Sequence, residues 1–314
     1  MSTTKYANAV AAVKAMENQL LSRSDMEQLI NASGKGEISS LIAAKRGSGG
    51  GPGSLNDVWE TINGYAPDDK ELKILLYRND FHNLKAALKA MIAGREPQDY
   101  YIRPTNLDLD ELSTALAAKD YEALPEHIRS TASEAYELLT RTLDGQLADS
   151  LIDTAAMRTM QRDAEKFGGD FMKSYARLIT AAADIKTAYR CALMKKPKNC
   201  IEMAVCGSHG LDKDDLVEAA VSGRESLFSL LESTEYDDGG RMLAKSPALF
   251  EKWCDDVIME LAETARMQAF GTDPLAAYYI AAEAELKNLR IITVCKESGA
   301  ARETITERMR KLYV

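Results

Sequence analysis

Three stretches of this chain resemble one another at a spacing of about one hundred residues. They read DFHNLKAALKAMIAG (80–94), AAADIKTAYRCALMK (181–195) and ELKNLRIITVCKESG (285–299). Each holds an Asn or Asp, then Leu or Ile, then Lys or Arg, and the middle residues Leu84, Ile185 and Leu289 are spaced at 101 and 104 positions. Solenoid repeats have periods of roughly 20 to 50 residues, so this longer period predicts a few small related domains instead.

Around each triplet, apolar residues recur every three or four positions, which is the period of one helix face. In chain order these positions are Tyr77, Phe81, Leu84, Leu88 and Met91; Leu178, Ala182, Ile185, Tyr189 and Ala192; and Ala282, Leu286, Leu289, Thr293 and Lys296. The stripe fades at the end of the third copy, and a second amphipathic segment follows every copy. We therefore predict three small helical domains around an approximate threefold axis, at 1–122, 123–226 and 227–314.

The fold class predicted from the sequence is all-α. Proline is scarce, whereas Ala, Leu, Glu, Lys and Met, which lose little side-chain freedom in a helix, are plentiful. Alternating strand patterns are nearly absent; IEMAVCG at 201–207 is the one weak candidate, and a short helix fits it equally well. Helix starts are predicted from a capping box at Ser24–Glu27 and from N-caps at Ser246 and Asp273, each followed by proline.

The glycine-rich stretch GSGGGPGS at 47–54 is predicted to be a flexible surface connection. A phosphate-binding loop of the Walker type needs a Lys after its glycines and a strand before them, and this stretch has neither. Pro52 also removes one backbone N–H that such a loop would use.

No residue pattern in the chain predicts a catalytic, cofactor or metal site. Cys200, Cys206 and His209 form the one local Cys/His cluster, which is a ligand short of a structural zinc site, so we expect ordinary thiols there. Paired carboxylates occur at 214–215, 237–238 and 255–256; we expect them to be solvated or to act as partners of helix dipoles.

The formal net charge of −9 disfavours nucleic-acid partners and anionic membrane surfaces, because both repel an acidic protein. No apolar run approaches the roughly 20 residues that a membrane helix needs, so we expect no direct membrane insertion. The first residues lack the long apolar region of a signal peptide, and the five cysteines do not suggest a disulfide framework. These features predict a cytoplasmic protein with reduced thiols.

The last segment, DPLAAYYIAAEAELKNLRIITVCKESGAARETITERMRKLYV, resembles the end of the C subunit of V/A-type rotary ATPases, which corresponds to the d subunit of the eukaryotic enzyme. The matching residues are Tyr278, Tyr279, Glu283, Glu285, Asn288, Leu289, Arg290, Gly299, Ile305, Arg308, Arg310, Leu312, Tyr313 and Val314. The stretches at 80–90 and 183–194 resemble the first two repeats of the same family, although Asp184 stands where Asn is usual.

The resemblance implies a funnel of three helical domains around a pseudo-threefold axis, without catalysis or a cofactor. In that family the funnel sits on the membrane rotor ring of proteolipid subunits and receives the tip of the central shaft, built from the D and F subunits. It further implies a cytoplasmic location, peripheral to the membrane through the ATPase complex. The sequence leaves open whether the ATPase complex works as a pump or as a synthase, and whether it moves protons or sodium ions.

Two sets of residues are candidate contacts with these partners. We expect six residues of the repeated helices to lie near the axis and contribute to the socket: Asp80, Asn83, Asp184, Lys186, Glu285 and Asn288. The alternative is that they are structural and pin interdomain helix ends by hydrogen bonds. Arg308 and Arg310 either face the rotor ring or pair with acidic residues of a neighbouring helix.

Two other functions stay open at this point. One is a cytosolic α-helical adaptor or scaffold unrelated to an ATPase, which an assembled complex with the shaft subunits would exclude. The other is an enzyme built on helical repeats, which would use the carboxylates or the cluster of Cys200, Cys206 and His209.

Overall fold

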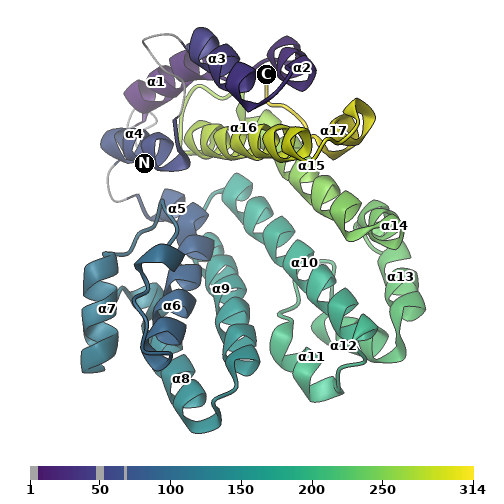
Figure 1. The fold of residues 1–314 in the computed structure, drawn as a ribbon. Coiled ribbons are helices and arrows are strands. Elements are labelled where there is room, and N and C mark those ends of the chain that lie inside the picture. Colours follow the sequence, from purple (N-terminus) through teal and green to yellow (C-terminus); the bar gives the residue numbers. More distant parts are fainter. Residues whose placement is uncertain (1–5, 47–52, 67–68) are drawn as a thin grey trace. The chain divides into compact units, whose positions relative to one another are not determined.

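The protein is described by a computed structural model, which covers residues 6–46, 53–66 and 69–314. These residues form a succession of helices (Figure 1). The β-type backbone pairing among them is an isolated antiparallel bridge between Ser208 and Leu211. The predicted all-α class is confirmed. The ambiguous stretch at 201–207 is helical where it begins, since α11 spans Lys198–Ala204.

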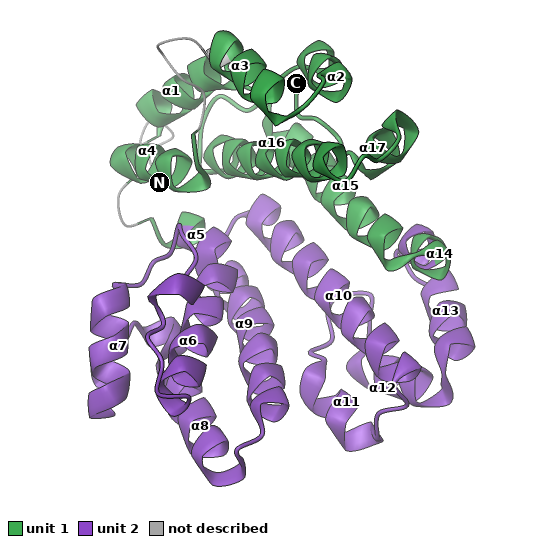
Figure 2. Cartoon of the chain, viewed as in Figure 1, with its two compact units in different colours: residues 1–72, 241–314 green, residues 73–240 purple. Residues whose placement is uncertain are grey.

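The chain divides into two compact units, which are shown in different colours in Figure 2. Unit 1 combines residues 1–72 with 241–314, and unit 2 comprises residues 73–240. This division into two units does not test the predicted domain boundaries at 122/123 and 226/227. These boundaries and the threefold arrangement stay predictions.

Unit 2 contains the first two copies of the repeated helix, which are α6 (Tyr77–Ile92) and α10 (Asp170–Leu193). The other elements of this unit are η2 (Ile74–Leu76), η3 (Gln98–Tyr100), α7 (Leu109–Ala118), η4 (Tyr121–Ala123), α8 (Glu126–Thr142), α9 (Gly145–Phe167), α11, α12 (Lys213–Ser222) and α13 (Arg224–Glu232). Helix α14 (Asp237–Lys245) crosses the boundary with unit 1.

A hydrophobic core in unit 2 joins α6 to α7, α8 and α9. Helix α6 contributes Phe81, Leu84 and Leu88, three members of the predicted apolar stripe, and all are essentially fully buried. Buried alanines, among them Ala132 on α8 and Ala156 on α9, leave little side chain between the helices and permit close packing. Burying each large aliphatic side chain contributes about 2 kcal/mol to folding.

Unit 1 is organised around the third copy, α16 (Asp273–Glu297). Its other helices are α1 (Ala7–Glu17), α2 (Arg23–Asn31), α3 (Lys35–Arg46), α4 (Leu55–Tyr65), α5 (Lys70–Lys73), α15 (Pro247–Ala265) and α17 (Arg302–Arg308); the last residue of α5, Lys73, already belongs to unit 2. Helices α1, α3, α4, α15 and α17 all pack against α16. One core cluster joins Met26 and Leu29 of α2 to Ile292 and Cys295 of α16. The first helices of the chain thus cover the third repeated helix.

The predicted helix starts need two corrections. The capping box of α2 is formed by Ser22 and Asp25, so the prediction at Ser24 was two residues late. Helix α16 begins at Asp273 after Thr272, one residue before the predicted start. At Ser246 the prediction is confirmed, because its hydroxyl accepts a hydrogen bond from the backbone N–H of Leu249 at 3.1 Å.

The glycine-rich stretch can be followed only at its end. Residues 47–52 lie outside the described residues, so the predicted flexible connection stays a prediction. Where the description resumes, Ser54 caps α4 by accepting from the N–H of Asp57, and the Asp57 carboxylate accepts in turn from the N–H of Ser54.

Candidate functional site

The polar residue of the first triplet, Asn83, lies on the buried face of α6 and is completely inaccessible to solvent. Its side-chain amide donates to the carbonyl oxygen of Ile102 at 2.9 Å and accepts from the N–H of the same residue at 2.8 Å. One amide therefore satisfies both backbone groups of Ile102, in the segment between η3 and α7. We call such a side-chain contact to a downstream backbone a clamp.

In the second copy the clamp residue is Asp184, which is also buried, on α10. Its carboxylate accepts from two successive backbone N–H groups, Cys206 at 2.9 Å and Gly207 at 2.8 Å, just after α11. A carboxylate has no N–H to donate, so it could not bond a carbonyl as Asn83 does. The backbone here presents two donors instead, which explains how Asp can occupy the position of Asn.

The third clamp residue, Asn288 on α16, repeats the geometry of the first. Its amide accepts from the N–H of Arg310 at 2.8 Å and donates to the carbonyl of Arg310 at 3.1 Å. The segment that is held follows α17 and leads into the last residues of the chain.

The three clamps are equivalent contacts of the repeated helices. Each ties a long helix to a backbone segment 19 to 23 residues further along the chain, within one unit. These hydrogen bonds are partly buried, and leaving a buried polar group without its partner costs about 1–3 kcal/mol. The clamp residues therefore stabilise segments of their own unit, and both the socket and the pinning of interdomain helix ends stay predictions.

A second buried carboxylate, Asp80, lies one turn before the clamp residue of α6. It accepts from the hydroxyl of Thr105 at 2.5 Å and from the N–H of Asn106 at 2.8 Å. The Nε2 of His127 on α8 lies 2.9 Å from its other oxygen. Asp80 thus fixes the same connection that Asn83 holds and ties it to α8.

The corresponding residue of the third copy is Glu285, buried on α16, whose carboxylate accepts from the N–H of Leu21. This bond holds the turn that precedes the capping box of α2. In the second copy the position is Ala181, so only the first and third copies have a carboxylate here, and the two carboxylates hold different segments.

The remaining candidates differ in exposure. Lys186 is half-buried on α10, and Arg308 is exposed at the end of α17. Arg310 pairs through Nε with Asp255 of α15 at 2.8 Å and donates through Nη1 to the carbonyl of Arg308 at 2.7 Å. Contact of any of the eight candidates with a partner protein stays a prediction. The polar residues at 80, 83, 184, 285 and 288, and Arg310 with them, already use polar side-chain atoms inside the fold.

The paired carboxylates at 255–256 have a role that the sequence interpretation missed. Besides the pairing of Asp255 with Arg310, Asp256 accepts from the N–H of Lys311 at 2.6 Å. Lys252, one turn earlier on α15, donates to the carbonyl of Met309 at 2.6 Å. These carboxylates were expected to be solvated or to serve helix dipoles, but they hold the carboxyl-terminal tail, residues 309–314, against α15.

The tail is also held at its far end. Tyr313 is buried, its hydroxyl donates to Glu17 of α1 at 3.1 Å, and its carbonyl accepts from Arg266 at 2.9 Å. The Arg266 guanidinium lies 5.3 Å from the centre of the Tyr313 ring, a cation–π distance. The Leu-Tyr-Val ending that carried the family resemblance is therefore a packed part of unit 1.

Burial determines the protonation of two groups near the second clamp. It raises the pKa of Asp184 to about 6, against the lowering effect of the N–H groups of Cys206 and Gly207. Burial, with the negative charge of Asp184, raises the pKa of the Cys206 thiol to about 12. At neutral pH this thiol is protonated and a poor nucleophile.

The local Cys/His cluster is not drawn together. Cys206 donates a hydrogen bond to the carbonyl of Thr154 at 3.4 Å, while His209 is exposed and lies 4.0 Å from Glu235. Within the described residues, no group of three or more His, Cys, Asp or Glu side chains is placed to bind a metal ion. None of the described helices combines the length and apolar character needed to cross a membrane.

These features define a class: an all-α protein whose repeated helices are joined to downstream segments by buried polar clamps. Comparison with known proteins gives the family. The profile of the ATP synthase (C/AC39) subunit family matches residues 53–308, most of the chain, and the protein belongs to this family. A curated relative is the C subunit of the V-type sodium ATPase of Enterococcus hirae, 26% identical over 252 residues that cover 79% of this chain and 77% of that protein.

Proposed function

We propose that this protein is the non-catalytic central-stalk subunit of a V/A-type rotary ATPase. It acts as a socket that couples the shaft of the D and F subunits to the proteolipid rotor ring, so that ATP hydrolysis or synthesis is linked to ion translocation. The three-domain funnel and a position on the cytoplasmic side of the membrane, peripheral through the complex, are parts of this proposal. Family membership and the curated relative support it.

The observation that carries the proposal is the set of three equivalent clamps. A subunit that transmits torque must resist deformation, and connections between helices are the softest parts of a helical protein. Asn83 and Asp184 each fix such a connection to a long helix through two hydrogen bonds, and Asn288 fixes the carboxyl-terminal tail in the same way. Contacts that stiffen all three repeated helices in the same way suit a subunit that transmits torque.

Titration calorimetry with the D–F shaft complex of the same organism tests the shaft contact. We expect one-to-one binding that weakens between low and physiological salt, because polar interfaces are screened by ions. Absence of binding at both salt concentrations would contradict the proposal and favour an adaptor unrelated to an ATPase.

Capture of the detergent-solubilised proteolipid ring on immobilised protein tests the ring contact. The variant Arg308→Ala removes the exposed candidate at the end of α17, and Arg302→Ala removes an exposed arginine at the start of the same helix as a matched control. We expect the first to weaken ring capture by about threefold to tenfold and the second to leave it unchanged. Equal capture by both variants would remove Arg308 from the proposed interface.

A further inference from the structure

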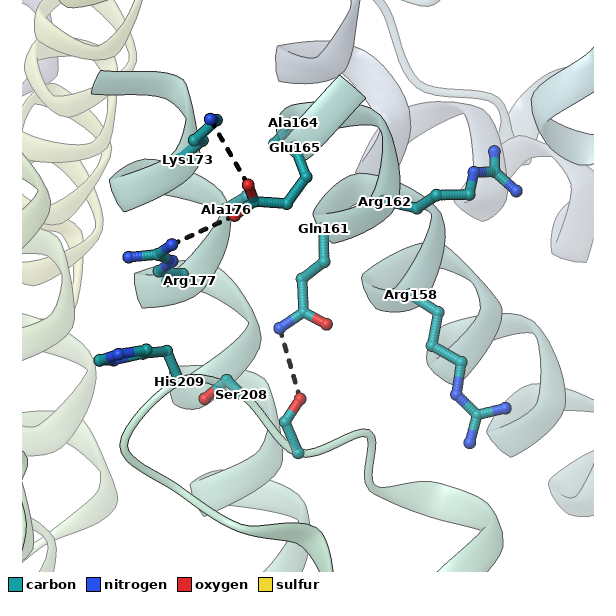
Figure 3. A pocket seen from close by; sticks show the side chains of 11 residues that line it. Arg158, Gln161, Arg162, Ala164, Glu165, Lys173, Ala176, Arg177, Ser208 and His209 are labelled. Atoms are coloured by element: carbon teal, nitrogen blue, oxygen red, sulfur yellow. Dashed lines mark hydrogen bonds and ion pairs between the residues drawn. The ribbon is translucent and has the colours of Figure 1, made fainter. Parts of the chain in front are cut away.

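A basic pocket lies on unit 2 between α9 and α10, with a volume of about 460 Å³ (Figure 3). Its lining includes Arg158, Gln161, Arg162 and Glu165 from α9 and Lys173 and Arg177 from α10. The loop at 207–209 closes one side. We refer to this feature as the basic pocket.

The lining carries four Lys and Arg side chains and a single carboxylate, in a chain whose net charge is −9. Glu165 is shared by two of the cations, at 3.1 Å from Arg177 and 3.5 Å from Lys173, and Arg177 is the main cause of its lowered pKa. Figure 3 shows the side chains of Arg158 and Arg162 pointing away from this trio. Arg162 is itself paired through Nε with Asp163 at 2.8 Å. The four cations of the lining therefore still outnumber Glu165 and Asp163, the two carboxylates that pair with them.

The shape of the basic pocket is fixed by the second clamp. Asp184 holds the backbone at Cys206 and Gly207, and Gln161 donates to the carbonyl of Gly207 at 3.3 Å. Gly207 has a φ of +77°, and a Cβ there would come within 3.0 Å of Lys213. A pocket wall that is formed before binding lowers the entropic cost of association.

From these observations we propose that the basic pocket receives carboxylate side chains of an acidic segment on the shaft; this inference rests on the proposed function and names a contact for it. Guanidinium groups bind carboxylates through paired hydrogen bonds, and arginine is enriched at protein interfaces. Phosphate sites commonly use runs of free backbone N–H groups. Here the N–H groups of Cys206 and Gly207 are already taken by Asp184, so the donors that the pocket offers are side chains.

A basic pocket on an acidic protein also steers an acidic partner toward one place on the surface during association. Long-range repulsion from the net charge opposes an acidic partner everywhere except where positive charge is concentrated. Binding through the pocket is therefore expected to be specific in position and sensitive to ionic strength.

Charge reversal tests the inference with a matched control. The double variant Arg158→Glu/Arg177→Glu reverses two cations of the pocket, and the carboxylate paired with Arg177 is the half-exposed Glu165. The control Arg95→Glu/Arg141→Glu changes the net charge equally at exposed arginines of unit 2 outside the pocket. Circular dichroism melting first establishes that both variants are folded.

Calorimetric titration with the D–F complex then compares wild type and both variants at two salt concentrations. We expect the pocket variant to raise Kd by about tenfold or more and to lose most of its salt dependence, while the control stays within about twofold of wild type. Equal binding by the two variants would overturn the inference and leave the proposed function standing. Failure of the wild-type protein to bind would contradict the proposed function and this contact with it.

A third arm separates protein carboxylates from small anions. The titration is repeated in sodium phosphate and in sodium chloride of equal ionic strength. Similar Kd values in the two salts support a protein partner, whereas strong competition by phosphate that is absent in the pocket variant would identify a small-anion site and overturn the assignment.

Discussion

The substitution Asn83→Asp tests the physical reasoning about the clamps most sharply. It changes an NH₂ group to an oxygen in a side chain with no exposed surface. The N–H of Ile102 keeps its acceptor, but the carbonyl of Ile102, now 2.9 Å from the amide nitrogen, would face a second oxygen. The buried carboxylate of Asp80 lies one turn away on the same helix.

The expected cost follows from these contacts. A buried group that loses its partner costs about 1–3 kcal/mol, and the nearby negative charge adds to this. We expect Asn83→Asp to lower the free energy of unfolding of unit 2 by about 2–4 kcal/mol at pH 7.5. Burial and Asp80 raise the folded-state pKa of the new carboxyl, so the variant recovers stability as the pH falls and loses it as the pH rises through that pKa.

Urea unfolding followed by circular dichroism at pH 5 and pH 7.5 measures this effect. Asn199→Asp is the matched control, because it makes the same chemical change at an exposed site in the first turn of α11, where an added negative charge is tolerated. We expect the deficit of Asn83→Asp relative to the control to shrink to about 1 kcal/mol at pH 5, where a protonated carboxyl can donate to the Ile102 carbonyl. A deficit that is absent at pH 7.5, or that does not change with pH, would refute the account of the clamp.

Two further predictions concern the second clamp and the carboxyl-terminal tail. Burial raises the folded-state pKa of Asp184 to about 6, above its ordinary value of 3.8, so this group makes the free energy of unfolding fall as the pH rises from about 4 to about 6. Asp184→Asn should remove this contribution, up to roughly 3 kcal/mol, from the pH dependence measured by urea unfolding. An unchanged pH dependence would show that Asp184 is not the titrating group. Tyr313→Ala should destabilise unit 1 by about 3 kcal/mol in thermal unfolding, because the buried ring is lost. Tyr313→Phe removes only the hydrogen bond to Glu17 and should cost about 1 kcal/mol. Similar losses for both variants would contradict packing as the main role of the ring.

The sequence predicted the fold class because helix propensity and apolar period are local properties. It also singled out the positions of Asn83, Asp184 and Asn288, since the triplet recurs with a near-constant spacing. Their role could not be predicted in the same way. Whether a polar residue on a helix faces a partner protein or a backbone segment of its own chain depends on where a loop 19 to 23 residues away is placed.

The helix-start error has a similar origin. Ser22 and Ser24 each have an acidic residue three positions later, so both fit the capping-box pattern. The structure uses Ser22, after a turn in which the N–H of Leu21 is bound by Glu285, 264 positions away in the sequence. The sequence near the helix start thus fits a capping box at Ser22 and at Ser24, and the one that forms lies next to the long-range hydrogen bond between Leu21 and Glu285.

The basic pocket was missed for a comparable reason. Its cations come from separate turns of α9 and α10, and none forms a recognisable run in the sequence. The spacing of Arg158 and Arg162 on one helix face was the available signal, but such pairs are common on solvated helices. Only the packing of α9 beside α10 and the loop at 207–209 makes them into a pocket.

Electron cryo-microscopy of the ATPase complex, purified from its own membranes through an affinity tag on this protein, tests the central claim most directly. The account predicts that the D and F subunits and the proteolipid ring co-purify, and that density for this protein lies on the rotation axis between shaft and ring. Purification of the tagged protein without any ATPase partner, or density on the periphery of the complex, would contradict its assignment as the central-stalk coupling.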